Sequence, residues 1–394
     1  MASGHTSKVE PPEASASAAP GAGTRRRSRV IEFDLSGVVG VRLEGAAAAE
    51  RDAVGRQLGL EPTTLVGEPD IVIRFVDSIR PAGRLRLLGL RDTAFDDDGF
   101  LVLRGAHKSS VRVRIPLDQV GERCEVVCER GLSSVPLLVP LVNMRALSLG
   151  AVPLHASSFV HEGTGVVVTG WTKGGKTEAL LAFTSHGAEY VGDEWIYVLP
   201  EGDRVLGLPE PIRLWDWHLR QLPSVRAKLS TGDQRRLGAF RTLERSRRAA
   251  ARRNGRVAGV AARLGPLVER QLGVDVDPRA LFSAQTLPRE ASFDRLFFVV
   301  THASDEITVE PADPIELARR MVFSLEYERL DLRAAYLSFR FAFPDAANDL
   351  LARAEALQRE TLEHRFAGKP AYVVHHPYPV DLARLYDAMR PYCV

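Results

Sequence analysis

The segment VVVTGWTKGGKTEALLAF, residues 166–183, constrains the fold of this chain more than any other stretch. It begins with β-branched valines, which favour a strand, and ends in Ala and Leu residues, which favour a helix. Between them, Gly170, Gly174 and Gly175 allow backbone conformations that other residues rarely adopt. The segment therefore predicts a buried strand, a tight turn and a helix in direct succession.

The turn itself, GWTKGGKT, matches the pattern G-x-x-x-x-G-K-[ST]. In such a P-loop, successive backbone N–H groups and the N-terminus of the following helix point into one hollow. The lysine reaches the β- and γ-phosphates of a nucleotide, and the threonine hydroxyl binds Mg²⁺. The alternative is a glycine-rich turn without a ligand. We expect a nucleotide site formed by Gly170, Trp171, Thr172, Lys173, Gly174, Gly175, Lys176 and Thr177.

Two acidic residues, Asp193 and Glu194, follow a short apolar segment, and Asp193 comes 17 residues after Lys176. In many ATPases the acid lies much further along the chain. A gap this short is similar to that of compact kinases, whose acceptor hydroxyl lies beside the γ-phosphate. A carboxylate there can hold Mg²⁺, accept the proton of the attacking hydroxyl, or do both. The alternative for this acid pair is the solvated end of a hairpin.

Taken together, residues 154–198 resemble the catalytic core of the HPr kinase/phosphorylase family, which shares its fold with phosphoenolpyruvate carboxykinase. The resemblance is carried by a histidine before a glycine-turn hairpin, a P-loop, a glutamate directly after it, and an acidic pair after a strand. Here these features are His155, residues 170–177, Glu178 and the pair Asp193-Glu194. The resemblance implies an α/β fold with a P-loop core of this kind. It also implies ATP and Mg²⁺ as cofactors, and γ-phosphate transfer to a serine or threonine hydroxyl.

The resemblance also implies roles for individual residues. Lys176, Glu178 and the loop amides would bind the nucleotide, and Thr177 would bind the metal. Asp193 would be the catalytic base and a metal neighbour, with His155 close to the acid pair and tuning it. Less direct candidates are Glu210 as a further metal ligand and Arg213 as a group that neutralises phosphate charge. The alternatives are a core histidine for His155, and a surface pair for Glu210 and Arg213.

This chain departs from the family pattern at several points. The family's acid pair is usually Asp-Asp, so the role of Glu194 in catalysis is open, and Trp171 and Lys173 replace small residues. HPr is therefore not the expected acceptor, and the reverse phosphorylase reaction is not expected. The chain is more similar to divergent relatives that accompany peptide-modifying gene sets, which implies a peptide or small-protein acceptor such as a natural-product precursor. The competing hypothesis is a nucleotide-binding regulator or docking protein with weak or no phosphate transfer.

Composition divides the chain into unlike parts. Residues 1–29 are rich in Ala, Ser, Pro and Gly and predict a disordered tail. Residues 30–145 predict an N-terminal α/β domain, suspected of substrate recognition, and residues 146–394 the catalytic domain. A strongly basic insertion at about 220–280 is either a solvated surface or a docking face for an acidic partner.

The remaining elements follow from the periodicity of apolar residues. In the first half we expect strands or helices within 29–43, 46–59, 69–76, 100–105, 109–117 and 135–150. In the second half we expect strands at 152–162, 163–170, 293–303, 306–311 and 371–377, a hairpin at 188–209, and helices at 176–186, 314–329, 346–366 and 379–390.

Several function classes are disfavoured. The net charge of +2 gives no reason to expect nucleic acid as a partner, and no apolar run is long enough to cross a membrane cleanly. Only three cysteines occur, so we expect a soluble cytoplasmic protein, with a homo-oligomer left open because the family forms hexamers. Three small motifs are predicted not to bind metal: the Cys124/Cys128 pair, the acidic turn at 96–99, and the adjacent His375 and His376.

Overall fold

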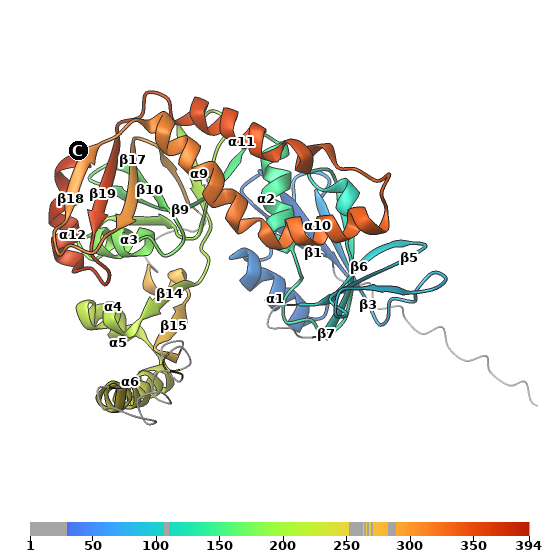
Figure 1. The fold of residues 1–394 in the computed structure, drawn as a ribbon, viewed down its shortest axis with the longest axis horizontal. Coiled ribbons are helices and arrows are strands. Elements are labelled where there is room, and N and C mark those ends of the chain that lie inside the picture. Colours follow the sequence, from blue (N-terminus) through green and yellow to red (C-terminus); the bar gives the residue numbers. More distant parts are fainter. Residues whose placement is uncertain are drawn as a thin grey trace, which may run out of the picture.

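The structure is a computed structural model that describes residues 30–105, 110–251, 271–282 and 289–393, with the isolated positions 263, 265 and 268. The tail predicted at residues 1–29 lies outside this part. So do residues 254–255, an Asn-Gly pair at which the sequence predicts a break in the helix of the basic insertion. The described chain is a mixed α/β protein with two large sheets and one two-stranded sheet (Figure 1). Its helices all lack the combination of length and apolar character needed to cross a bilayer.

The first large sheet belongs to the N-terminal part of the chain, and its strand order is β1-β2-β3-β8-β7-β6-β5-β4. Helix α1, Ala48–Leu58, joins the parallel strands β2 and β3 and ends at Gly59 in the left-handed conformation. Alternate residues of β3 are buried, as the sequence predicts for a strand with one face on a core. The strands are β1 Ile31–Asp34, β2 Gly40–Glu44, β3 Ile71–Val76, β4 Arg86–Leu88, β5 Thr93–Asp96, β6 Gly99–Arg104, β7 Ser110–Arg114 and β8 Cys124–Glu129.

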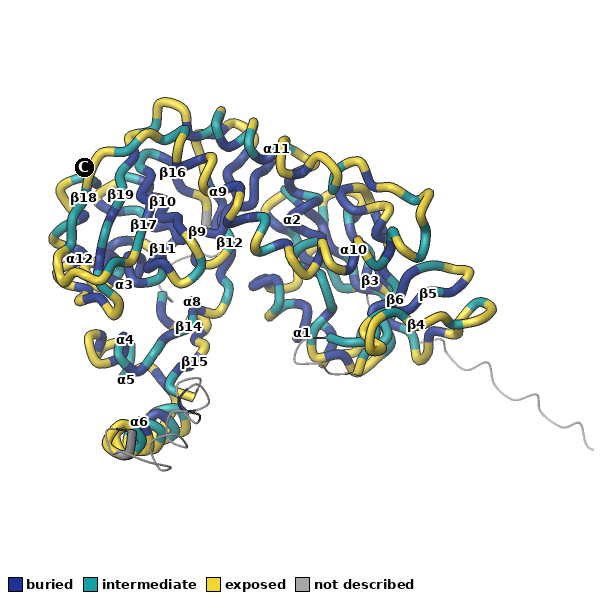
Figure 2. Tube along the Cα trace, in the orientation of Figure 1, coloured by how far each residue is buried: buried dark blue, intermediate teal, exposed yellow. Residues whose placement is uncertain are grey.

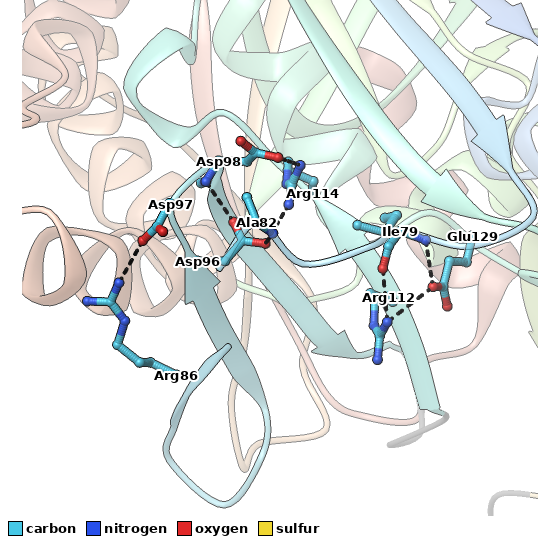
Figure 3. A network of polar contacts seen from close by, with 10 residues as sticks. Ile79, Ala82, Arg86, Asp96, Asp97, Asp98, Arg112, Arg114 and Glu129 are labelled. Atoms are coloured by element: carbon cyan, nitrogen blue, oxygen red, sulfur yellow. Dashed lines mark hydrogen bonds and ion pairs between the residues drawn. The ribbon is translucent and has the colours of Figure 1, made fainter. Parts of the chain in front are cut away.

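The acidic run between β5 and β6 forms a tight turn, as predicted (Figure 3). The buried Asp96 carboxylate accepts the backbone N–H groups of Asp98 and Gly99 at 2.9 and 3.0 Å. The same carboxylate pairs with the Arg114 guanidinium at 2.7 Å. Asp97 pairs with Arg86 at 2.9 Å. The carboxylates are therefore occupied by amide and guanidinium donors.

The second large sheet carries the P-loop motif. Its order is β16-β13-β12-β9-β10-β17-β19-β18, and β11 pairs with β9. Strand β10, which contains the valine run, lies between antiparallel β9 and parallel β17, and all three valines are fully buried. The strands are β9 Val152–His161, β10 Thr164–Gly170, β11 Glu189–Gly192, β12 Trp195–Val198, β13 Arg204–Gly207, β16 Arg289–Ser292, β17 Arg295–Thr301, β18 Thr308–Pro311 and β19 Ala371–His376.

A small unit leaves this sheet and returns to it. It consists of β14 Ile212–Trp215, α4 Asp216–Gln221, α5 Pro223–Lys228, α6 Thr231–Ala251, β15 Gly273–Val276 and α8 Pro278–Leu281. Strands β14 and β15 pair with each other and with no strand of the large sheets. The unit begins at Ile212, earlier than the basic composition alone indicates. Figure 2 shows α6 as largely exposed, whereas the strands around β10 are buried. We call residues 212–281 the inserted unit.

Helices from the C-terminal half join the two large sheets. The predicted helices at 314–329 and 346–366 are confirmed as α9, Pro314–Glu328, and α11, Asp349–Phe366. Helix α10, Leu330–Ala342, was not predicted, because it follows α9 with only Arg329 between them and neither Gly nor Pro marks the junction. Helix α10 packs on β5 and β6 of the first sheet, with Phe339 and Phe100 edge to face at 6.0 Å. The remaining helices are α2 Leu138–Ser148, α3 Lys176–Thr184 and α12 Leu382–Met389.

Candidate functional site

The segment that matches the P-loop pattern has the strand, turn and helix that its sequence predicts. Strand β10 ends at Gly170 and helix α3 begins at Lys176. Gly170, Lys173 and Gly175 have φ angles of 152, 60 and 110°, so the backbone between strand and helix curls back on itself. The Lys176 side chain is 6% exposed, and its Nζ donates to the Trp171 carbonyl oxygen at 3.0 Å. Burial lowers the pKa of this lysine, while the nearby carboxylates raise it.

A buried histidine of strand β19, His376, contacts the backbone of this loop. His376 is fully buried, and its Nε2 lies 2.9 Å from the Gly174 carbonyl oxygen. Its Nδ1 lies 2.8 Å from the Pro377 carbonyl oxygen, so both ring nitrogens are engaged. A Cβ atom on Gly175 would come within 2.2 Å of Nε2. Gly175 is therefore required by both its φ angle and this ring. His375, on the same strand, is less buried and lies near His302 instead, so the two adjacent histidines have separate environments.

Asp193 lies next to the first turn of α3, as the acid-pair hypothesis requires. The Thr177 hydroxyl donates to its Oδ2 at 2.9 Å, and only 2% of Asp193 is exposed. Burial, together with the negative charge of Glu194, raises the pKa of Asp193 from 3.8 to about 7. The hydrogen bond from Thr177 and the charge of Lys176 limit that rise. Asp193 is therefore a carboxyl group that exchanges its proton near neutral pH.

His155, on β9, lies between two carboxylates. Its Nε2 is 3.1 Å from Glu194 Oε2, and its Nδ1 is 2.9 Å from Glu328 Oε1. The Glu328 contact is a close charge pair rather than a well-aligned hydrogen bond. Burial lowers the pKa of His155, but the two carboxylates outweigh it and the net pKa is raised. The hydrogen bond with His155 in turn lowers the pKa of Glu194.

Two details of this cluster were not visible in the sequence. Glu194 has a φ of 67°, an uncommon conformation for a residue with a side chain, and its carboxylate reaches His155. For the segment around Glu326 the sequence predicts only an ordinary amphipathic helix face, and this prediction is incomplete. Its neighbour Glu328, at the last position of α9, faces the catalytic histidine candidate. No local pattern distinguishes Glu328 from the other acids of that helix.

Glu210 lies outside the cavity wall but close to the acid pair. Burial and the charges of Glu194 and Asp193 raise its pKa well above the usual range. The backbone of Pro209 and Glu210 packs against Gly59, the residue that follows α1. A Cβ atom added to Gly59 would lie only 2.9–3.0 Å from that backbone. The first sheet's helix therefore contacts the segment that carries this candidate metal ligand.

The loop, the acid pair and the inserted unit line one cavity of about 740 Å³. Its lining includes His155, Asp193 and Glu194, and also the aromatic residues Trp215, Trp217 and Tyr378. Of the predicted nucleotide-site residues, Thr172, Lys173, Gly174, Gly175, Lys176, Thr177, Glu178 and Arg213 line this cavity.

Gly170 and Trp171 are not among the residues that line this cavity, and Arg213 lines it but has another partner. The Trp171 side chain is 49% exposed and contacts Tyr327 of α9, with ring centroids 5.0 Å apart, so it does not line the cavity. Arg213 lines it, and its guanidinium also pairs with Asp275 at 2.9 Å and lies over Trp215. To bind a phosphate, the Arg213 guanidinium would therefore have to leave Asp275 or contact both groups at once.

The oxygen atoms of Thr177 and Asp193 suit Mg²⁺ better than they suit a metal whose ligands all come from protein side chains. Within the described residues, no group of three or more His, Cys, Asp or Glu side chains is arranged to hold a metal. Mg²⁺ is usually bound by one or two protein oxygens together with phosphates and water. Thr177 and Asp193 provide two such oxygens beside the loop.

Comparison with protein-family models and with curated protein sequences finds no match for this chain. Its function must therefore be inferred from the chemistry of the cavity. Three groups define that chemistry: the loop amides with Lys176, the neutral-range carboxyl of Asp193, and the carboxylate-bound His155.

Proposed function

We propose that this chain is an ATP-dependent kinase that transfers the γ-phosphate to a serine or threonine hydroxyl of a peptide or small protein. The observation that carries the proposal is the placement of Asp193. Its carboxyl is buried, has a pKa of about 7 and is hydrogen-bonded to the Thr177 hydroxyl of the P-loop. A general base works best when its pKa lies near the working pH.

Binding of the triphosphate is assigned to the loop. The curled backbone from Gly170 to Gly175 would offer N–H groups to phosphate oxygens, apart from that of Gly174, which donates to the Trp171 carbonyl oxygen at 3.0 Å. Helix α3 adds the positive end of its dipole. Lys176 exchanges its bond to the Trp171 carbonyl oxygen for the β- and γ-phosphates. When bound, Mg²⁺ neutralises charge on those phosphates, and Thr177 and Asp193 would hold it, with Glu210 nearby.

In the transfer step, the acceptor hydroxyl oxygen forms a bond to the γ-phosphorus. The bond between that phosphorus and the β–γ bridging oxygen breaks, and ADP leaves. The hydroxyl proton passes to the Asp193 carboxylate, which therefore must be deprotonated at the start of the step. His155 lies between Glu194 and Glu328, and these carboxylates raise its pKa. In its protonated form it would offset the negative charge of Glu194, which is one cause of the raised pKa of Asp193.

The decisive experiment follows phosphate from γ-labelled ATP into a library of serine- and threonine-containing peptides, with the products read by mass spectrometry. We expect a mass increase of one phosphate on a hydroxyl residue, and its loss in Asp193→Asn with nucleotide binding retained. Tight ATP binding without transfer to any acceptor would contradict the kinase proposal and favour the regulator. Failure of the wild-type protein to bind ATP would contradict both.

A further inference from the structure

The cavity lining combines two kinds of side chain. Asp193 and Glu194 are acidic, whereas Trp215 and Trp217 from the inserted unit and Tyr378 from the loop after β19 are aromatic. The Trp217 and Tyr378 rings meet edge to face, 5.6 Å apart and inclined at 86°. Tyr378 is 50% exposed, and Trp217 is half-buried. These two rings form what we call the aromatic corner.

The aromatic corner is fixed relative to the P-loop by a buried hydrogen-bond chain. Glu178, in the first turn of α3, lies 3.1 Å from His218 Nε2. The Nδ1 atom of the same ring accepts the Trp215 backbone N–H at 3.1 Å, which places the ring proton on Nε2, facing the carboxylate. His218 is 1% exposed. The position of Trp217 on α4 is thereby tied directly to the start of the P-loop helix.

A second pair of hydrogen bonds connects the segment that follows Tyr378 to helix α4. The Gln221 side chain, at the end of α4, donates to the Val380 carbonyl oxygen at 3.1 Å. It also accepts the Leu382 backbone N–H at 2.9 Å. The inserted unit and the C-terminal loop therefore meet through defined polar contacts, and the two rings have a set spacing.

We propose that the aromatic corner of Trp217 and Tyr378 is a nucleobase site, on which the base of the bound nucleotide stacks. This inference rests on the proposed function. The transferred phosphate must face Asp193, so the nucleoside must extend away from it. Thr177 of α3 contacts Asp193, whereas the next residue, Glu178, contacts His218. Successive helix residues point about 100° apart, and the His218 ring lies against Trp217, so the two rings lie on a different side of the start of α3 from Asp193. Stacking on an aromatic face suits any base, since every base has a π-face.

A different occupant is an aromatic side chain of the acceptor. The nucleobase is favoured because the rings are connected to α3 through Glu178 and His218, whereas Asp193 is connected to α3 through Thr177. An acceptor hydroxyl must instead approach Asp193. The two occupants give different results when nucleotide binding is measured without an acceptor.

The test compares ATP with inorganic tripolyphosphate, which has the same phosphate chain but no base. Calorimetric affinities for both are measured with the wild-type chain, Trp217→Ala and Tyr378→Ala. We expect Trp217→Ala to weaken ATP binding by roughly tenfold to a hundredfold, from the usual cost of removing one stacking partner. Tripolyphosphate affinity should change by less than about twofold, because that ligand makes no stacking contact. Phe341→Ala, at an exposed ring on α10, is the control and should change neither affinity.

Each outcome decides the matter. Unchanged ATP affinity in both ring variants overturns the proposal, and an effect seen only on acceptor KM assigns the corner to the acceptor. Equal weakening of ATP binding and tripolyphosphate binding also overturns it, because the rings would then merely support the loop.

Trp217→Phe, which keeps a stacking face, should bind ATP within about threefold of wild type. This control separates loss of stacking from misfolding of the alanine variant. If wild type binds tripolyphosphate and ATP equally, the base site fails while the phosphate site stands. If it binds neither, the proposed function fails as well.

Discussion

Replacing Asp193 by Asn should abolish phosphate transfer and, at alkaline pH, make the protein more stable. The native state raises the pKa of this carboxyl from 3.8 to about 7, so folding makes its ionisation unfavourable. The folded protein then binds more protons than the unfolded chain between these two pH values, and the free energy of unfolding falls as pH rises across that range. Asn has nearly the shape of the protonated carboxyl and can still accept the Thr177 hydroxyl hydrogen bond.

The magnitude follows from the same two pKa values. Above pH 7 the buried charge costs about 4 kcal/mol, because each tenfold change in acidity corresponds to about 1.4 kcal/mol. Asp193 is 2% exposed, so solvent screens little of this cost. Asn removes the charge, and the variant should gain up to this amount at about pH 8.5. At about pH 5 wild type is already largely protonated in the folded state, and the gain should fall below half.

The assay is urea unfolding of both proteins at the two pH values, followed by tryptophan fluorescence. Asp387→Asn is the matched control, because Asp387 is exposed on α12 and far along the chain from the cavity. It should change stability equally little at both pH values. Two results would show that the buried charge of Asp193 does not destabilise the folded protein. One is a lower free energy of unfolding for Asp193→Asn than for wild type at the higher pH. The other is an equal gain in that free energy at both pH values. The electrostatic account of the base would then be wrong.

Three further results are expected. In the kinase assay, kcat/KM should rise with pH through about 7, because Asp193 must lose its proton to act as base and kcat/KM reports the free enzyme. Glu328→Gln should move the titration of His155 to lower pH, visible in its ring proton resonances, because a charge that raises the histidine pKa is removed. Gly175→Ala should destabilise the protein by about 1–3 kcal/mol from backbone strain alone, with more from the clash with His376, measured by thermal unfolding.

Matched variants separate these effects from general damage. Glu326→Gln removes a neighbouring charge of α9 that pairs with Arg329, and it should leave the His155 titration in place. Gly187→Ala has the same kind of positive φ as Gly175 but no atom within 4 Å of the added methyl, so it should show the strain without the clash. A pH-independent kcat/KM across the neutral range would contradict the role given to Asp193.

The local part of the site could be predicted because its signals are contiguous. Strand β10, the loop and α3 follow from valines, glycines and a helix-forming run within residues 166–183. The spacing indicated that Asp193 belongs to this site, and in the structure its carboxylate accepts the Thr177 hydroxyl hydrogen bond, since one helix and one short strand return the chain to a neighbouring position. Family resemblance placed His155 beside the acid pair, and its contact with Glu194 agrees.

The rest of the site depended on the tertiary structure. Glu328, His218, Tyr378 and His376 reach the loop from elements far away in the sequence, and nothing in their own neighbourhoods marks them. Their positions follow from the register of β17 and β19 against β10, and from the packing of helices around the sheet. Such contacts are set by the summed burial of many apolar side chains. The sequence alone therefore determined the glycine-rich loop and its nearest acid, whose geometry depends on local backbone preference, whereas long-range packing decided what surrounds them.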